Sequence, residues 1–306
     1  MYNHESTKMN TKVLVLHHND NDGCCAAWVV KHYYDTVMGV EDVTTVPVQY
    51  NEEPPFHLLD KDTTLYIVDF SYKRPILLQM KDMVKEIHVF DHHATAKEEL
   101  EGLEFAKFSN TKAGAGLTWE ILFNGLEPLQ FIKLVDDYDL WKFEFNETEA
   151  FHSITGIIDV KNMKFWDDLC KVPGYYDHIV SKGKEKLYYE NLEITKIVTS
   201  DKIKFTTFHC NGKEYKVAIY KTTHNLSKVG NRLLKDNPDL DFTFCWFIVP
   251  KDGSVVFSMR STDIKEVNLG KDIAKVYGGG GHKNAAGFSL PLEEGLKMVE
   301  SFYKVS

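Results

Sequence analysis

The sequence predicts an α/β protein with two domains: a mostly parallel N-terminal sheet flanked by helices, and a smaller C-terminal α/β domain. Its 306 residues exceed what one ordinary domain of about 100–150 residues needs. In the first half, short apolar runs alternate with helix-like segments, a pattern typical of parallel sheets built through right-handed crossovers. Beyond residue 202, strand-like runs follow one another, separated by the hairpin signals Asn211–Gly212 and Asp252–Gly253.

The N-terminal half contains four short apolar runs that we interpret as buried strands. They cover residues 11–17, 44–49, 64–69 and 86–91. Helices are predicted at residues 26–34, 75–85, 114–124 and 127–135. The alternation predicts that the strands lie side by side in a mostly parallel sheet.

In the C-terminal half, the predicted strands are longer and more closely spaced. They cover residues 203–210, 213–220, 241–249 and 254–259, with helices at 226–235 and 269–277. A helix over residues 183–199 is expected to connect the two halves. We therefore predict an N-terminal domain over residues 1–195, including a helical linker region, and a C-terminal domain over residues 196–306.

Composition indicates the class of protein. With 43% apolar and 26% charged residues, the chain has the composition of a globular protein. No apolar run approaches the roughly 20 residues of a membrane-spanning helix, and residues 1–12 lack the apolar core of a secretory signal. Five cysteines without paired spacing favour a reducing compartment. We expect a cytoplasmic protein without a membrane partner.

The net charge of −9 argues against binding to long nucleic acid, which normally requires a basic face. The charge is unevenly distributed. Residues 201–290 hold fourteen Lys and Arg against nine Asp and Glu, a net charge of +5, which leaves −14 for the remainder. The acidic part is suited to metal cations and the basic part to an anionic substrate, although ordinary surface charge is the alternative interpretation.

Acidic residues and histidines follow three of the four predicted N-terminal strands. The segment His17–Gly23 follows the first, Asp69 ends the third, and Asp91 with His92 and His93 ends the fourth. Because the carboxyl ends of parallel strands meet at one edge of the sheet, these side chains should converge. Clustered carboxylates raise one another's pKa unless a cation lies among them. Mixed imidazole and carboxylate ligands suit Mn, Fe, Zn or Co.

The Asp91-His92-His93 triplet at the end of an apolar strand resembles the signature of the DHH phosphoesterase superfamily. The segments His18–Gly23 and Val135–Trp141 resemble its first and fourth motifs, and Asp69 its second. The resemblance covers residues 13–141 and implies a site for two divalent metal ions, with Mn²⁺ favoured and Mg²⁺, Co²⁺ or Fe²⁺ as alternatives. The implied ligands are His18, Asp20, Asp22, Asp69, His92 and one aspartate of the fourth motif, for which we favour Asp137 over Asp136 and Asp139.

The resemblance also implies catalytic roles at the strand end. Asp69 would bridge the two metals. His93 would lie just outside the metal ligands, where it could steer the substrate phosphate or protonate the leaving oxygen. Asp91 is grouped with His93 as catalytic.

A second motif lies near the C-terminus, where four glycines begin the run GGGGHKNAAGF over residues 278–288. Glycines allow backbone N–H groups to approach an anion closely. The run resembles the DHHA1 domain that accompanies DHH domains, and the match extends over residues 214–290. The predicted substrate-binding residues are Arg260, Ser261, Gly279, Gly280, Gly281 and His282. Arg260 can bind a phosphate or carboxylate through two N–H groups, and a structural ion pair is the alternative.

These features favour a metal-dependent phosphodiesterase or exonuclease with its active-site cleft between the two domains. We expect it to convert short oligonucleotides, linear dinucleotides or nucleoside bisphosphates to mononucleotides, as in the oligoribonuclease branch of the family, related to RecJ. A long duplex is not expected as a partner, and a homodimer is an open alternative. The rival hypotheses are a RecJ-like single-strand DNA exonuclease, an enzyme resembling inorganic pyrophosphatase, and a catalytically silent nucleotide-binding protein. Tyr138 and Trp141 are candidates for stacking on a base.

Overall fold

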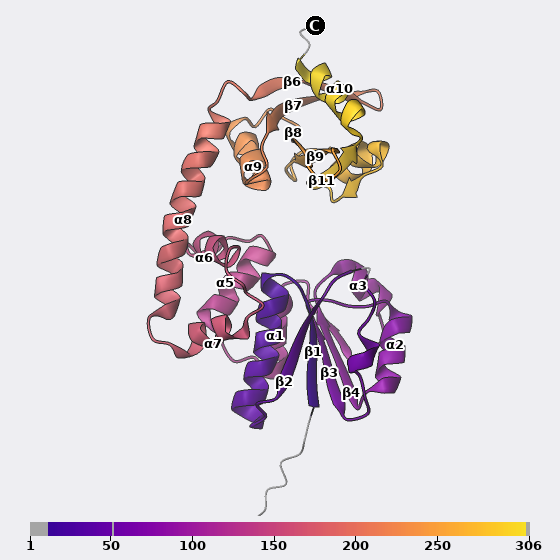
Figure 1. The fold of residues 1–306 in the computed structure, drawn as a ribbon, viewed down its shortest axis with the longest axis vertical. Coiled ribbons are helices and arrows are strands. Elements are labelled where there is room, and N and C mark those ends of the chain that lie inside the picture. Colours follow the sequence, from indigo (N-terminus) through magenta and orange to yellow (C-terminus); the bar gives the residue numbers. More distant parts are fainter. Residues whose placement is uncertain (1–11, 51, 304–306) are drawn as a thin grey trace, which may run out of the picture. The chain divides into compact units, whose positions relative to one another are not determined.

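The computed structural model describes residues 12–50 and 52–303 and divides the chain into two compact units, Met1–Leu187 and Tyr188–Ser306. Figure 1 shows their secondary structure. The division falls inside one helix, α8 (Tyr175–Val198), which also contains the predicted boundary between residues 195 and 196. The domain limits of 1–195 and 196–306 stay a prediction.

The N-terminal unit is built on a five-stranded sheet in the order β2-β1-β3-β4-β5, and every adjacent pair is parallel. The strands are β1 (Lys12–His18), β2 (Val43–Val48), β3 (Thr63–Val68), β4 (Glu86–Asp91) and β5 (Ala106–Phe108). Four of them match predicted strands within one or two residues. The first predicted strand began at Thr11, which lies outside the described residues, as do most of the residues considered for a signal sequence.

Helices cover both faces of this sheet (Figure 1). On one face, α1 (Asn21–Tyr33) and α4 (Gly114–Leu122) pack with α5 (Gln130–Asp139) against alternate strand residues such as Val13 and Val68. On the other face, α2 (Arg74–Met83) buries Leu77 and Met80 against the intervening strand residues. Burial on both faces explains why the strands are continuous apolar runs. The predicted mostly parallel α/β fold is confirmed.

Further helices of the N-terminal unit surround this core. They are α3 (Ala94–Glu99), α6 (Thr148–Thr155), α7 (Met163–Lys171), the π-helix η1 (Tyr34–Met38) and the short 3-10 helix η2 (Phe56–Leu58). Helices α6 and α7 and the start of α8 form the helical region that none of the sequence motifs covers. Phe165 and Trp166 of α7 join the same core as α1.

The C-terminal unit contains a six-stranded sheet in the order β10-β11-β9-β8-β7-β6, in which only β7 and β8 pair in parallel. Its strands are β6 (Lys204–Cys210), β7 (Lys213–Lys221), β8 (Phe242–Ile248), β9 (Val255–Arg260), β10 (Gly280–Gly281) and β11 (Ala285–Leu290). Helix α9 (Leu226–Asp236) packs on one face. On the other face lie α10 (Leu292–Tyr303), the π-helix η3 (Leu269–Ile273) and the 3-10 helix η4 (Ala274–Tyr277). The predicted second α/β domain is thus confirmed.

Within residues 12–50 and 52–303, no helix combines the length and the apolar character that crossing a bilayer requires.

Candidate metal centre

The candidate centre lies at the carboxyl edge of three neighbouring strands, β1, β3 and β4. His18 is the last residue of β1, Asp69 follows β3, and His92 and His93 follow β4. The sheet order 2-1-3-4-5 is that of doubly wound folds, in which ligands bind outside the carboxyl ends of the strands where the order reverses. The expected convergence of these residues follows from this topology.

The loop after β1 leads into α1 and adds two carboxylates to the same edge. Asp20 is the N-cap of α1 and accepts a hydrogen bond from the backbone N–H of Gly23 at 2.9 Å. Asp22 lies in the first turn and is buried, and it accepts hydrogen bonds from the N–H groups of Gly114 and Ala115 at 2.5 and 2.8 Å. The amino terminus of α4 therefore fixes the orientation of the Asp22 carboxylate.

Gly114 is required by this close approach. A Cβ atom at this position would lie 2.8 Å from Oδ2 of Asp22 and 3.0 Å from Cα of Asp69. Both distances are shorter than ordinary van der Waals contact, so only glycine allows α4 to begin against the two aspartates.

His92 lies at the centre of the cluster. Its Nε2 atom is 3.1 Å from Oδ1 of Asp69, 3.3 Å from Oδ2 of Asp139 and 3.8 Å from Oδ2 of Asp22. Nδ1 of His18 is 2.5 Å from Oδ2 of Asp20 and 3.8 Å from Oδ2 of Asp69. Asp69 thus connects the two histidine-centred halves, as a bridging ligand would.

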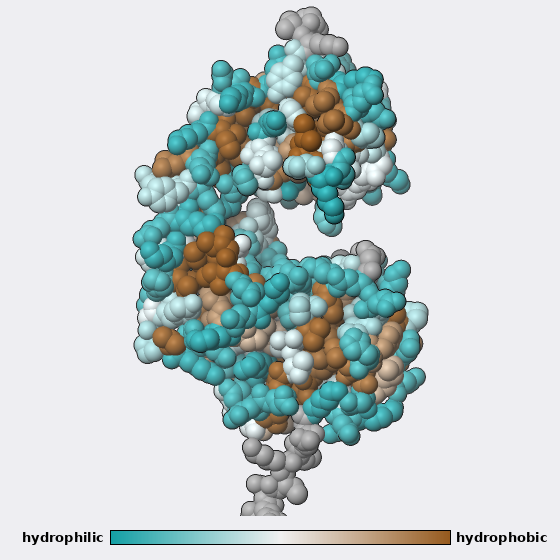
Figure 2. Space-filling model, in the orientation of Figure 1, coloured by the Kyte–Doolittle hydropathy of each residue, from teal (hydrophilic) through white to brown (hydrophobic). Residues whose placement is uncertain are grey.

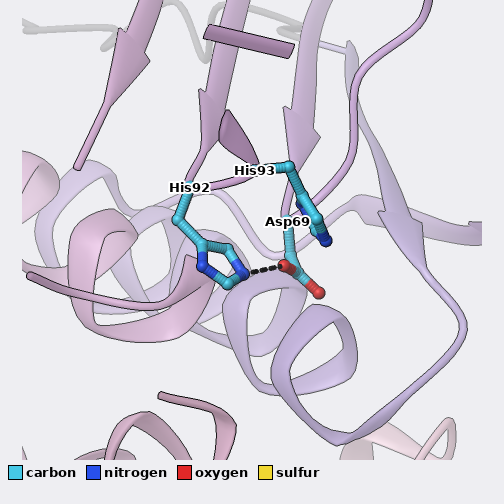
Figure 3. A group of neighbouring side chains, drawn as sticks. All are labelled: Asp69, His92 and His93. Atoms are coloured by element: carbon cyan, nitrogen blue, oxygen red, sulfur yellow. Dashed lines mark hydrogen bonds and ion pairs between the residues drawn. The ribbon is translucent and has the colours of Figure 1, made fainter. Parts of the chain in front are cut away.

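Three overlapping groups of side chains bring their ligand atoms within 4.8 Å of one another. They are Asp69–His92–His93, His18–Asp20–Asp69 and Asp22–His92–Asp139. Figure 3 shows the first group, in which both histidine side chains converge on the Asp69 carboxylate. Carboxylate oxygens and imidazole nitrogens at this spacing are a donor set suited to divalent transition-metal ions.

Electrostatics within the cluster favour a bound cation. Burial raises the pKa of Asp22 and of Asp69 well above the usual range of a carboxyl, and neighbouring carboxylates raise both further. Burial also raises the pKa of Asp139. Burial would raise the pKa of Asp20 as well, but the hydrogen bond with His18 helps to lower it overall. Divalent cations would stabilise the ionised form of the buried carboxylates, so the residues present fit such ions.

Asp69 has an unusual backbone conformation. Its φ angle is +53°, in the left-handed region that non-glycine residues seldom adopt and that aspartate tolerates better than most. Its N–H donates to the carbonyl oxygen of Phe90 at 2.8 Å, which ties this turn to β4. Such strained residues are frequent at functional sites because the surrounding structure holds them in place.

Asp91 supports its neighbours. It is fully buried, and its Oδ1 accepts hydrogen bonds from the backbone N–H of His92 at 2.7 Å and from that of His93 at 3.2 Å. The same oxygen is 2.7 Å from Nδ1 of His93. A carboxylate without exposed surface is placed to act through His93, so a positioning role is favoured for Asp91, and its catalytic role stays a prediction.

The structure corrects the choice made within the fourth motif. Asp137 is buried and turned away from the cluster: it accepts hydrogen bonds from the N–H groups of Glu144 and Phe145 at 2.9 and 3.3 Å and from the hydroxyl of Thr148. Asp139, two residues further along α5, lies beside His92. Residues two apart on a helix do not share a face, so only one of them can reach the site.

In the C-terminal unit, Arg260 ends β9. Its guanidinium donates to Oγ of Ser227 at 2.6 Å, Oγ of Ser258 at 3.2 Å and the carbonyl oxygen of Met259 at 2.7 Å. These bonds hold the side chain in one orientation. The neighbouring Ser261 is buried, and its hydroxyl donates to Oδ1 of Asn284 at 3.2 Å.

The glycine run forms a hairpin rather than an open loop. Gly280 and Gly281 pair with Gly287 and Ala286 of β11, and the N–H of His282 donates to the carbonyl oxygen of Ala285 at 2.8 Å. Gly281 has a φ angle of +135°, and a Cβ there would lie 2.6 Å from Cα of Ala286. Tight packing within the hairpin thus explains part of the run, and the side chain of His282 is exposed beside it.

Comparisons with known proteins agree with this geometry. Residues 214–305 match the DHHA1 domain family. The chain is 28% identical to an uncharacterised protein of Acanthamoeba polyphaga mimivirus, over 97% of this chain and 71% of the relative. It is 26% identical to the oligoribonuclease NrnB of Bacillus subtilis (strain 168), over 90% of this chain and 72% of the relative.

Two solved structures share the fold. The pGpG-specific phosphodiesterase PggH from Vibrio cholerae superposes with a TM-score of 0.59 at 16% identity, covering 95% of this chain and 97% of that one. Exonuclease RecJ bound to manganese superposes with a TM-score of 0.58 at 13% identity, covering 96% and 91%.

The parallel sheet with its edge of acids and histidines, followed by a DHHA1 domain, is the arrangement that a metal-dependent phosphoesterase would require. Residues 214–305 belong to the DHHA1 domain family, and over most of its length the chain is similar in sequence to the oligoribonuclease NrnB and in fold to PggH and RecJ.

Proposed function

We propose that this chain is a divalent-metal-dependent phosphodiesterase that hydrolyses short oligonucleotides or linear dinucleotides to mononucleotides. The observation that carries the proposal is the convergence of carboxylates and imidazoles on His92 and Asp69 at the edge of the sheet. Nucleoside bisphosphates are a further substrate class compatible with such a site.

The proposed ligands of two metal ions are His18, Asp20, Asp22, Asp69, His92 and Asp139, which are the members of the three overlapping groups apart from His93. We favour Mn²⁺ because imidazole and carboxylate ligands are mixed, with Mg²⁺, Co²⁺ or Fe²⁺ as alternatives. When bound, such ions activate water and neutralise charge on the phosphate.

The other residues of the site bind and orient the substrate. His93, held through Nδ1 by Asp91, is our candidate for positioning the phosphate or donating a proton to the leaving oxygen. In the C-terminal unit, Arg260 is proposed to bind a phosphate, with the exposed side chain of His282 as a second donor. Ser261, Gly279, Gly280 and Gly281 are proposed to shape this part of the substrate site.

The choice of a short substrate is supported by charge and by the relatives. A net charge of −9 disfavours long nucleic acid. One relative is named an oligoribonuclease, and one structural neighbour a phosphodiesterase specific for the dinucleotide pGpG. A RecJ-like exonuclease, a pyrophosphatase-like hydrolase and a silent nucleotide-binding protein are the rival hypotheses.

The test compares three substrates with Mn²⁺: a radiolabelled ribodinucleotide, single-stranded DNA and pyrophosphate. Release of mononucleotides from the dinucleotide is expected. Efficient degradation of long single-stranded DNA instead favours the RecJ-like reading, and orthophosphate from pyrophosphate alone favours the pyrophosphatase-like one. No turnover of any phosphoester supports the silent protein.

A matched pair of variants tests the ligand assignment in the same assay. Asp69→Asn should abolish turnover and weaken Mn²⁺ binding measured by calorimetry, because a proposed metal ligand loses its charge. Asp168→Asn removes a partly exposed carboxylate that pairs with Lys164 on α7, away from the cluster, and should leave both properties unchanged. Near wild-type activity of Asp69→Asn would refute the assignment.

A further inference from the structure

A cavity of about 770 Å³ opens beside the candidate metal centre, entirely within the N-terminal unit. Asp20, Asp22 and Asp139 form one wall, so the cavity is continuous with the acidic cluster. The rest of its lining comes from the end of α5, from α6 and from the segment after α6. Its volume lies within the range of about 300–1,000 Å³ typical of sites for small organic ligands.

One side of the cavity is aromatic and held firmly. Tyr138 stacks on His152 with ring centroids 3.2 Å apart and an angle of 7° between the planes. The amide nitrogen of Asn21 lies 3.3 Å from Nδ1 of His152 and donates to the hydroxyl of Thr155 at 2.8 Å. These contacts join α1, α5 and α6 into a rigid aromatic wall next to the acidic residues.

Trp141 extends this wall to the mouth of the cavity. Its side chain packs edge-on against Tyr138 at 5.5 Å between ring centroids, yet 56% of its surface is exposed. Its φ angle is +56°, a conformation that is costly for a bulky residue. Burial in the core does not account for a tryptophan here, whereas contact with a ligand would.

Another part of the cavity lining is the segment after α6. Ile157 is 66% exposed, Ile158 and Val160 are partly buried, and Lys161 adds a positive charge. Figure 2 shows apolar residues gathered at the surface over α6. Both this segment and Trp141 therefore offer apolar contacts to a flat group bound in the cavity.

We propose that this cavity binds the nucleoside next to the scissile phosphate, with its base stacked on Trp141. The inference rests on the proposed function and deepens it. Ions held by the acidic wall would bind the phosphate, so the adjoining nucleoside is the part of a dinucleotide that reaches the aromatic wall. Because stacking uses the π-face that every base has, the site accepts any base. It also gives a role to the segment after α6.

Calorimetric binding of AMP and of ribose 5-phosphate in the presence of Mn²⁺ tests the proposal. The two ligands share the phosphate and sugar and differ in the base. Wild-type protein should bind AMP about ten-fold more tightly, as expected for base–aromatic stacking. Trp141→Phe should keep most of this preference. Trp141→Leu, which removes the aromatic ring but keeps an apolar side chain, should bring the ratio of the two affinities close to one.

Phe205→Leu serves as the control, because Phe205 is a half-exposed aromatic residue of β6 in the other unit. It should bind both ligands as wild-type protein does. Equal binding of AMP and ribose 5-phosphate by wild-type protein, or an unchanged AMP preference in Trp141→Leu, would overturn the nucleoside site.

Hydrolysis of a ribodinucleotide separates this inference from the proposed function. Trp141→Leu should raise the KM about ten-fold and change kcat little, as expected for the loss of stacking. If Trp141→Leu does not affect hydrolysis, the proposed phosphodiesterase activity is supported and the stacking site is refuted. A base preference that is lost in Trp141→Leu, in a protein that cleaves no phosphodiester, supports the nucleoside site and refutes the proposed function.

Discussion

Two aspartates of α5 should respond in opposite ways to the same substitution. Asp137→Asn replaces a buried carboxylate that accepts hydrogen bonds from Glu144, Phe145 and Thr148. An amide has only one acceptor oxygen, so its NH₂ group must face a former donor. Because hydrogen bonds to charged groups contribute about 1.5–3 kcal/mol, we expect the free energy of unfolding to fall by about 2 kcal/mol.

Asp139→Asn should have little effect on stability or increase it. Ligand oxygens of Asp22 and Asp139 lie within 4.8 Å of each other. At that separation, two unit charges repel by about 3.5 kcal/mol at an effective dielectric constant of about 20. This is an upper limit on the stabilisation, because the carboxyl groups take up protons when no cation is bound and Asp139 is partly exposed to water.

Thermal unfolding of the N-terminal unit and calorimetric titration with Mn²⁺ measure the two effects. A loss of 2 kcal/mol lowers the Tm by about 4–8 °C in a unit of this size. Asp137→Asn should show this loss and bind Mn²⁺ as wild-type protein does. Asp139→Asn should keep its Tm and bind Mn²⁺ at least ten-fold more weakly. The reverse pattern, with weak Mn²⁺ binding in Asp137→Asn alone, would refute the assignment of Asp139.

Three further predictions concern pH, the hairpin and the arginine. Burial lowers the pKa of His32 in the folded protein, so folding favours the neutral imidazole. The folded state therefore loses stability as the pH falls below about 6.5, where the unfolded chain takes up a proton at His32. His32→Phe should lose less stability between pH 7 and pH 5 in denaturant titrations. Gly281→Ala should destabilise the C-terminal unit by about 1–3 kcal/mol. Gly280→Ala should change the Tm of this unit little, because a Cβ there meets nothing within 4 Å. Equal changes in Tm for the two variants would contradict the hairpin packing. Arg260→Lys should raise the KM for a ribodinucleotide about ten-fold, and an unchanged KM would count against a phosphate contact.

The sheet of the N-terminal unit was predictable because its strands are buried on both faces. Such strands are short continuous apolar runs, and their order along the chain implies a common edge. The convergence of Asp69 and His92 could therefore be anticipated from sequence. Strand β5, with three residues, is too short to give such a signal.

Which aspartate of the fourth motif enters the site could not be predicted. The apolar pattern predicted a helix ending at residue 135, and the helix continues to Asp139. Because Asp137 and Asp139 both lie on α5, the helix geometry determines the direction in which each side chain points. Nothing in the local sequence indicates that residues 144–148 donate hydrogen bonds to the carboxylate of Asp137.

The C-terminal glycines show a similar limit. Four glycines are compatible with a loop that approaches an anion and with a tight hairpin, and only the pairing with β11 distinguishes the two. Nor did the sequence indicate the cavity beside α6, since its apolar lining resembles ordinary core residues.

The proposed metal ligands come from four separated segments, the first at residue 18 and the last at residue 139. No fragment of the unit can assemble them, so affinity for the ions and cooperative folding are two aspects of a single equilibrium. Chelation would then do more than stop catalysis. It would leave buried carboxyl groups that must take up protons, and the ion-free chain would be the form that proteases degrade first.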